Sequence, residues 1–226
     1  MNRVPLLALA FALLASAHDP ITTKLTWTTD IVRIVYAKCG SCHRPGGSAP
    51  MSLLDYADAR PWAKAIKEEV LERRMPPWGA VKGFGDFAND PSLTQEELHL
   101  IADWVEGGAP EGDPKYLPDR PAWSTAAADP FQPKWLVSAP LRLSAPAALG
   151  AVRVEGVPEH RSLKVVAVEP GGRIQPLLWL YGYRHKYTRT YAYREPVRLP
   201  AGTTIVVAPA GIARQIAFSE APSRGR

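Results

Sequence analysis

The chain has 226 residues, of which 46% are hydrophobic and 22% are charged, a balance that is typical of a globular protein and excludes an intrinsically disordered one. The formal net charge is +5, but residues 18–120 carry 12 Lys or Arg against 16 Asp or Glu, whereas residues 121–226 carry 14 against 6. This division predicts that the basic half docks on the acidic half or on an acidic partner, the alternative being an ordinary solvated basic surface.

The first 17 residues have the pattern of a secretory signal peptide. Arg3 precedes an apolar run over residues 4–14, and the small residues Ala15-Ser16-Ala17 fit a signal peptidase site. The run is too short to cross a bilayer, and no later stretch approaches the ~20 apolar residues of a membrane helix. We therefore expect cleavage after Ala17, no membrane span, and a periplasmic or secreted mature protein for which nucleic acid is not an expected partner.

A short amphipathic helix is expected over residues 28–38, because Ile31, Ile34 and Val35 occur at helical spacing. It leads into Cys39-Gly40-Ser41-Cys42-His43, which contains both cysteines of the chain and has the pattern of a c-type haem attachment site. Each thiol can add to a haem vinyl group, and the adjoining imidazole then reaches the iron from the same side. The motif therefore predicts one covalent haem c on Cys39, Cys42 and His43, which agrees with export.

Three other interpretations of the cysteine pair remain open but explain less. A thioredoxin-like redox pair belongs in a βαβ unit, whereas helix-like sequence precedes this pair. Half of a zinc site needs two further ligands at a similar spacing, and the two Cys and five His of the chain do not supply them. A disulfide across two intervening residues closes a small ring and leaves His43 unexplained.

Further helices are expected over residues 52–57, 62–74 and 94–106, the last with a capping box formed by Thr94 and Glu97. Glycines and prolines predict loops over residues 44–50 and 79–91.

The helix over residues 62–74 ends at Met75-Pro76-Pro77-Trp78, where two prolines fix the backbone next to an isolated thioether. Once the signal peptide is removed, Met51 and Met75 are the remaining methionines, and Met51 follows His43 too closely to reach the opposite face of the haem easily. Met75 is therefore the predicted sixth ligand, although a methionine can also be core filler. A Met/His pair suits electron transfer, because it raises the reduction potential and closes the iron to other ligands.

The order of helix, C-x-x-C-H motif, Met-Pro loop and terminal helix resembles class I cytochrome c over residues 27–106. Within that class, this stretch looks like the bacterial cytochrome domains found fused to copper type II monooxygenase-like domains. The residues that carry the resemblance are Cys39 to His43, Pro50, Tyr56, Trp62, Met75 to Trp78 and Gly108 to Pro110. The resemblance implies thioethers to both cysteines, a proximal His43 and a distal Met75.

Residues 111–133 are rich in Pro, Asp, Ala and Ser, which predicts a linker. Short apolar runs then alternate with turn signals, which predicts an antiparallel β-sandwich over residues 134–220. Residues 163–207 resemble the last part of the copper type II monooxygenase sandwich, but residues 134–220 contain only His160 and His185 as histidines and no Met. The resemblance therefore implies a truncated relative that lacks copper.

Residues 181–198 interleave tyrosines with arginines and a lysine. The favoured interpretation is a hairpin with its tyrosines inward and its cations outward. The alternative is a basic aromatic face that binds a polyanion, a glycan or a partner protein.

Together these features predict two domains, an all-α class I cytochrome c domain followed by an all-β, jelly-roll-like antiparallel sandwich. The predicted bounds are 1–17 for the signal peptide, 18–110 for the cytochrome c domain, 111–133 for the linker, 134–220 for the sandwich and 221–226 for a tail.

The expected function is that of an exported monohaem cytochrome c, an electron carrier rather than an enzyme. The sandwich would serve as the docking module for redox partner proteins. Two alternatives stay open: a peroxidase-like haem enzyme with an open distal site, for which a suitable distal histidine is lacking, and a ligand-binding sandwich whose cytochrome senses redox state.

Overall fold

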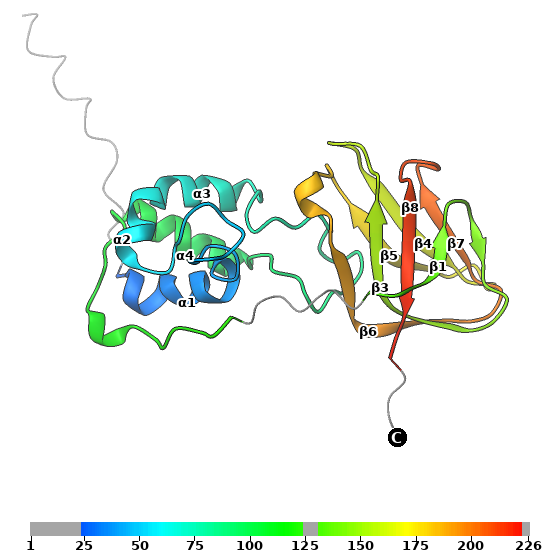
Figure 1. Ribbon diagram of the computed structural model, residues 1–226, viewed down its shortest axis with the longest axis horizontal. Helices are drawn as coiled ribbons and strands as arrows, with labels where there is room; N and C mark the ends of the chain where they lie inside the picture. Colours follow the sequence, from blue (N-terminus) through cyan, green and yellow to red (C-terminus); the bar gives the residue numbers. More distant parts are fainter. Residues whose placement is uncertain (1–23, 124–130, 223–226) are drawn as a thin grey trace, which may run out of the picture. The chain divides into compact units, whose positions relative to one another are not determined.

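The computed structural model describes residues 24–123 and 131–222 (Figure 1). The predicted signal peptide lies outside the described residues, as do residues 124–130 of the predicted linker and 223–226 of the predicted tail. The chain divides into two compact units. The first unit contains the residues up to Glu72 and Leu93–Pro121, and the second, here called the two-sheet unit, contains Arg73–Ser92 and the residues from Ala122 onward.

The first unit begins with a helical segment that ends at the first cysteine of the motif. Its three consecutive stretches are Trp27–Ile31, α1 (Val32–Ile34) and Val35–Cys39. The outer two have the wide π-helical turn, in which an amide bonds to the carbonyl five residues earlier; the N–H of Gly40 thus donates to the carbonyl of Val35 at 2.8 Å. At the start, the Thr26 side chain accepts a hydrogen bond from the Thr29 amide and caps the helix.

The remaining helices of the first unit are short. They are α2 (Tyr56–Ala59), a 3-10 turn at Arg60–Trp62, α3 (Ala63–Leu71), α4 (Gln95–Glu106) and a 3-10 turn at Pro114–Tyr116. The predicted capping box starts α4, because the Thr94 hydroxyl accepts from the Glu97 amide and the Glu97 carboxylate accepts from the Thr94 amide. Within the described ranges, no helix is both long enough and apolar enough to cross a membrane.

The core of the first unit is aromatic and aliphatic. Trp27 and Trp104 are almost completely buried, and their ring centroids are 6.0 Å apart. The indole N–H of Trp104 donates to the carbonyl of Pro110 at 2.9 Å, and the hydroxyl of Tyr56 donates to the carbonyl of Ala109 at 2.9 Å. These bonds tie the chain that follows α4 back onto α4 itself and onto α2.

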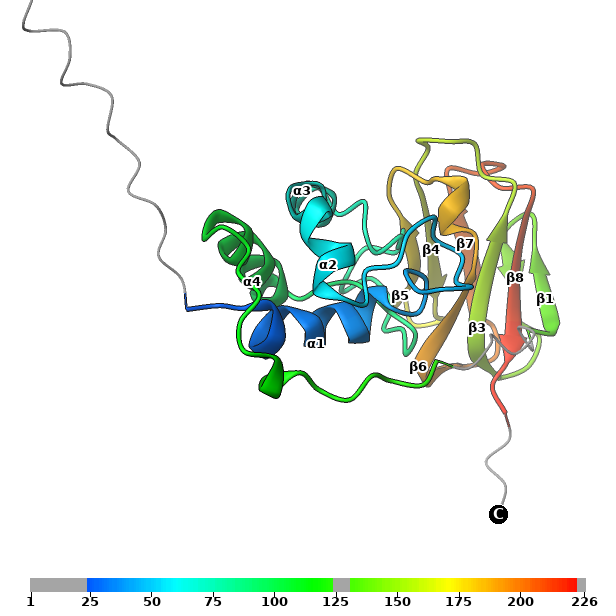
Figure 2. The same cartoon turned by 60° about the vertical axis from the view of Figure 1, so that its left-hand side comes forward.

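The two-sheet unit is built from antiparallel strands (Figure 2). The strands are β1 (Pro133–Val137), β2 (Leu141–Arg142), β3 (Ala147–Glu155), β4 (Leu163–Val168), β5 (Ile174–Leu180), β6 (Thr190–Leu199), β7 (Thr204–Ala208) and β8 (Gln215–Glu220). A 3-10 turn at His185–Tyr187 precedes β6. One sheet has the order β1-β8-β3-β6 and the other the order β2-β7-β4-β5, so β6 and β5 are edge strands.

Buried side chains from both sheets form one hydrophobic core. Because successive residues of a strand point to opposite faces, β4 buries Leu163, Val165 and Ala167 and leaves Lys164 exposed. The tyrosines of residues 181–198 follow the favoured interpretation in part. Four of them, Tyr183, Tyr187, Tyr191 and Tyr193, are buried, whereas Tyr181 is 68% exposed.

Residues 73–92 belong to the two-sheet unit although the chain passes through the first unit before and after them. Ala80 pairs with Leu180 of edge strand β5, and Phe87 pairs with Tyr193 of edge strand β6. An uncovered strand edge exposes unpaired amide and carbonyl groups. The segment therefore lies along one edge of each sheet and pairs with some of the amide and carbonyl groups at both edges.

The predicted fold class is wrong. No all-α cytochrome domain is evident among the described residues, because the α-helices contain only 3, 4, 9 and 12 residues and two antiparallel sheets dominate. Glycines and prolines interrupt the helical pattern between these helices, and part of residues 73–92 pairs with sheet edges instead of packing among helices. A class I cytochrome c domain followed by a jelly-roll-like sandwich therefore does not describe this chain.

We expect Leu178→Ala to lower the free energy of unfolding by about 2–5 kcal/mol, because it removes buried methyl groups from the core. Leu178 is 0% exposed, whereas Leu136 on β1 is 58% exposed and provides a control. Leu136→Ala should change stability by no more than about 0.5 kcal/mol. Urea unfolding followed by tryptophan fluorescence measures both values, and equal stability of the two variants would contradict this core.

Candidate functional site

The C-x-x-C-H motif occupies a single helical turn at the end of the helical segment. The N–H groups of Cys42 and His43 donate to the carbonyl of Cys39 at 3.1 and 2.9 Å. Residues three and four positions apart on such a turn share one face. Cys42 and His43 therefore occupy the two positions that neighbour Cys39 on this turn.

The ring of His43 is held by a backbone carbonyl. Its Nδ1 lies 3.2 Å from the carbonyl oxygen of Met51. A carbonyl can only accept, so the proton of the neutral ring is on Nδ1 and the lone pair is on Nε2. Histidines that bind metals commonly donate their other ring N–H in this way, which fixes both the tautomer and the orientation of the ring.

The loop that follows the motif fixes the motif's backbone. The amide of Ala49 donates to the carbonyl of Cys42, and the amide of Leu53 donates to the carbonyl of His43, both at 3.1 Å. A Cβ on residue 47 would lie 2.1 Å from the carbonyl oxygen of Cys42, so the loop can approach this closely only with Gly47. The close return of the loop is also what brings Met51 to the His43 ring.

The two thiols have different surroundings. Both are free, with Cys42 exposed and Cys39 partly buried. Burial raises the pKa of Cys39 to about 12, and the neighbouring Cys42 and Glu97 add to this rise. A Cys-x-x-Cys redox pair works through a thiol whose pKa is lowered. The raised pKa of Cys39 gives no support to a role for this residue as the reactive thiol of such a pair.

The zinc interpretation also finds no support in the described part of the chain. There, no three His, Cys, Asp or Glu side chains are grouped so that they could hold a metal ion. The motif places two thiols and one imidazole on a single turn of backbone. This set fits a haem that is attached through two thioethers and bound at iron by Nε2 of His43.

Met75, the predicted sixth ligand, lies in a different unit from the motif. Cys39, Cys42 and His43 belong to the first unit, whereas Met75 belongs to the two-sheet unit. Its side chain is partly exposed. Met51, the other methionine of the expected mature chain, follows the motif within the first unit and contributes its carbonyl to the His43 ring.

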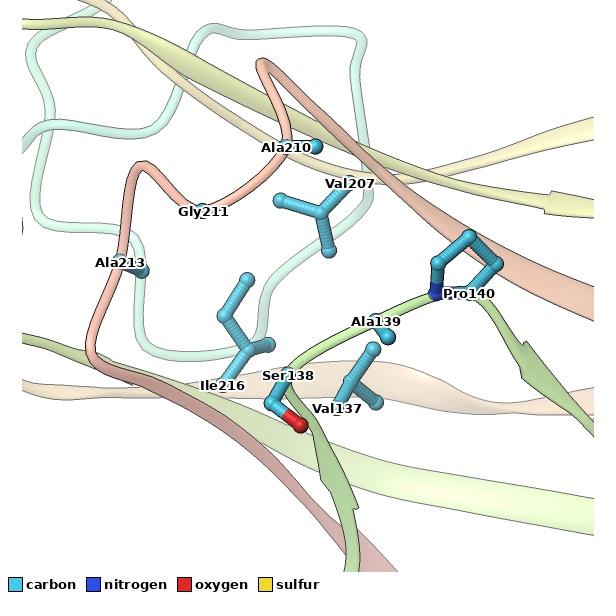
Figure 3. Close-up of a pocket in the computed structure, with 9 residues that line it drawn as sticks. All are labelled: Val137, Ser138, Ala139, Pro140, Val207, Ala210, Gly211, Ala213 and Ile216. Carbon is cyan, nitrogen blue, oxygen red and sulfur yellow. The ribbon is translucent and has the colours of Figure 1, made fainter.

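A small pocket opens in the two-sheet unit between the turn that follows β1 and the loop that precedes β8 (Figure 3). Val137, Val207 and Ile216 give it a mainly apolar lining. Its volume of about 20 Å³ is enough for roughly one water molecule. It contains none of the predicted site residues, and it is too small for a cofactor.

Sequence reasoning missed two contacts of residues that it had singled out, namely the Met51 carbonyl at the His43 ring and the aromatic packing of Trp78. The Met51 carbonyl is a backbone group, which every residue type carries, so no motif marks it. Trp78 packs against aromatic rings that follow it by nine and by more than one hundred residues. The only local signal was an aromatic residue directly after two prolines.

Comparisons with known proteins do not identify a relative. No protein-family model, curated protein or solved structure matches the chain. Neither a cytochrome c family nor a copper monooxygenase-like family is therefore identified, and the functional argument depends on the motif and its geometry.

In the haem-free protein, we expect a water-soluble maleimide at pH 7.5 to label Cys42 faster than Cys39. Cys42 is exposed, whereas the raised pKa of the partly buried Cys39 keeps its thiol protonated until the pH nears 12. Labelling rates of the single-cysteine variants Cys39→Ser and Cys42→Ser, followed by mass spectrometry, test this order. Urea should equalise the two rates, and equal rates without urea would contradict the difference in environment.

Proposed function

We propose that this protein is an exported electron carrier with a single haem c, bound through thioethers to Cys39 and Cys42 and at iron by His43. The observation that supports this most strongly is the hydrogen bond from His43 Nδ1 to the carbonyl of Met51. This bond leaves the lone pair of Nε2 available to bind a metal, and His43 shares a helical turn with both thiols. A Cys-x-x-Cys-His sequence that arose by chance would not be expected to have an oriented histidine ring as well.

Cys39, Cys42 and His43 would hold the haem in different ways. Cys39 and Cys42 anchor it covalently, so that it stays attached during repeated electron transfer. His43 would bind the iron through Nε2, and the hydrogen bond of its Nδ1 to the Met51 carbonyl fixes the orientation of the ring. When bound, the haem supplies an iron that accepts and releases one electron at a time.

We further propose Met75 as the sixth ligand and the two-sheet unit as the docking module for a redox partner protein. Thioether sulfur raises the reduction potential of haem iron and closes it to small molecules, which favours electron transfer over catalysis. The excess of Lys and Arg over Asp and Glu in residues 121–226 suits an acidic partner. The signal-like first 17 residues support export to the periplasm or beyond, where thioether attachment takes place.

Periplasmic expression together with a cytochrome c maturation system should give a product that is heavier than the mature chain by one haem and stays haem-stained on a denaturing gel. The double variant Cys39→Ala/Cys42→Ala should carry no covalent haem, because no thioether can form. His43→Ala should lose the low-spin spectrum of the ferric haem. His99→Ala is the matched control, since His99 is exposed and its ring pairs with Gln95 on its own helix. A wild-type chain that acquires no haem would refute the proposal.

Met75→Ala should abolish the weak near-infrared absorption band of ferric iron bound to methionine sulfur and should lower the reduction potential. Met51→Ala is its control, because the carbonyl that holds His43 survives that substitution. The optical spectrum and a redox titration measure both effects. If the wild type lacks the band and its ferrous form binds carbon monoxide readily, Met75 is not a ligand and the peroxidase-like alternative gains support.

A further inference from the structure

We propose that the outer face of the sheet β2-β7-β4-β5 is a docking surface for an anionic lipid membrane. The outer face is the side of this sheet that points away from the core shared by the two sheets. This inference goes beyond the proposed electron transfer and does not depend on the haem. All the residues that support it belong to the two-sheet unit.

The pairing of the strands defines which side chains share this outer face. Residues directly opposite each other on antiparallel strands point to the same side of a sheet. Val165 of β4 is completely buried, and its partners Val207 and Leu178 also contribute to the core. Because successive residues alternate between the two sides, the pairs on either side of these residues point outward.

Most of the outward side chains are apolar. They include Val166, Val168, Ile174, Pro176, Trp179 and Val206. All six are exposed or partly exposed, and Ile174 is 63% exposed. The charged side chains among the outward positions are Lys164 and Arg142, both exposed. The four described strands of this sheet contain no acidic residue.

The outer face of the other sheet has the ordinary composition of a solvated surface. Arg153 and Glu155 give β3 both signs of charge, and Arg153 donates to the hydroxyl of Thr190 at 2.8 Å. Lys134 of β1 forms an ion pair with Glu220 of β8. An antiparallel sheet that has one face in the core usually has such a polar outer face. The apolar outer face of the sheet β2-β7-β4-β5 is therefore exceptional, and exposed apolar patches mark interaction sites.

Aromatic rings extend the apolar face at its β5 edge. The ring centroid of Trp179 lies 5.8 Å from that of Phe84 and 6.3 Å from that of Tyr181, both in edge-to-face geometry. The segment that carries Phe84 is fixed beside β5, because the amide of Val81 donates to the carbonyl of Trp179 at 2.8 Å. Trp and Tyr combine an apolar ring with a polar tip, which favours the headgroup level of a membrane.

Lys164 places a positive charge directly above this apolar surface. Its ammonium lies 4.1 Å from the centroid of the Trp179 ring. The aliphatic part of a lysine can cover apolar surface while its ammonium stays at the level of water or of lipid headgroups. Together with Arg142, Lys164 gives the face a positive charge that attracts anionic headgroups.

This charge pattern favours a lipid surface over a second copy of the chain or a partner protein. Contact with the same face of a second copy would bring Lys164 and Arg142 towards their counterparts, and the four strands offer no carboxylate to pair with them. The cores of protein interfaces are depleted in lysine, because removing its charge from water is costly. A membrane instead lets the ammonium remain among hydrated headgroup phosphates while the apolar side chains contact the acyl boundary.

The test is co-sedimentation of the full-length protein with lipid vesicles. One set of vesicles contains equal parts of phosphatidylglycerol and phosphatidylcholine, and the other contains phosphatidylcholine alone. We expect the protein to bind the anionic vesicles more tightly than the neutral ones. Added salt should weaken binding to the anionic vesicles, because it screens the attraction between exposed charges.

Two matched pairs of variants locate the binding surface. Ile174→Asp should weaken binding to anionic vesicles about tenfold or more, because it removes an apolar contact and adds a charge that the headgroups repel. Leu136→Asp is its control, since Leu136 is a similarly exposed aliphatic residue on the other sheet, 58% exposed. Lys164→Gln should weaken binding about fivefold, the effect of one basic residue near an anionic membrane. Lys134→Gln is its control, because the Lys134 ammonium also lies over a tryptophan ring, 5.0 Å from that of Trp135.

Several results would overturn the inference. These are failure of the wild type to bind anionic vesicles, equal binding to both kinds of vesicle, and an equal loss in Leu136→Asp and Ile174→Asp. Self-association that Ile174→Asp abolishes, without vesicle binding, would assign the face to a second copy. Photo-crosslinking from position 174, but not from position 136, to an acidic protein instead of lipid would assign it to a protein partner.

The test is independent of the proposed haem chemistry. A wild type that binds anionic vesicles but acquires no covalent haem would overturn the proposed function and leave this inference standing. A haem-loaded wild type that does not bind them would do the reverse. All four substituted positions are exposed, so we expect wild-type midpoints of thermal unfolding. If Ile174→Asp does not fold, Lys164→Gln and its control decide the comparison.

Discussion

The hydrogen bond between His43 Nδ1 and the Met51 carbonyl is the interaction on which the proposed site depends. Without it, the His43 ring would be free to rotate and could present either nitrogen to a metal. The C-x-x-C-H turn would then not fix which nitrogen binds. The bond exists because the loop after the motif returns over it, and Gly47 permits that return. Backbone geometry in a short loop therefore decides which nitrogen is free to bind iron.

The motif's chemistry is independent of the fold around it. Attachment through C-x-x-C-H needs only one helical turn, so the same chemistry can occur on different architectures. This explains how a motif order that resembles class I cytochrome c can occur in a chain that is mostly β-structure. Residues 73–92 make the difference, because their strand pairs with β5 and β6 place them with the sheets.

The two-sheet unit combines two roles in the proposed function. It carries the basic half of the chain, which suits contact with an acidic partner. It also carries Met75, in a segment whose Ala80 and Phe87 pair with the edge strands β5 and β6. Met75, the proposed sixth ligand, and the proposed docking surface therefore belong to the same unit.

The sequence by itself determined the local features. The capping box at Thr94 and Glu97 and the helical turn of the cysteine motif follow from contacts within a few residues, and the buried and exposed residues of β4 follow the alternation of its sequence. Only the tertiary structure decided that residues 73–92 join the sheets and that Met51 holds His43. Strand-edge pairing links residues about one hundred positions apart, and a backbone carbonyl has no sequence signature. The predicted fold class therefore failed where long-range pairing outweighed local pattern.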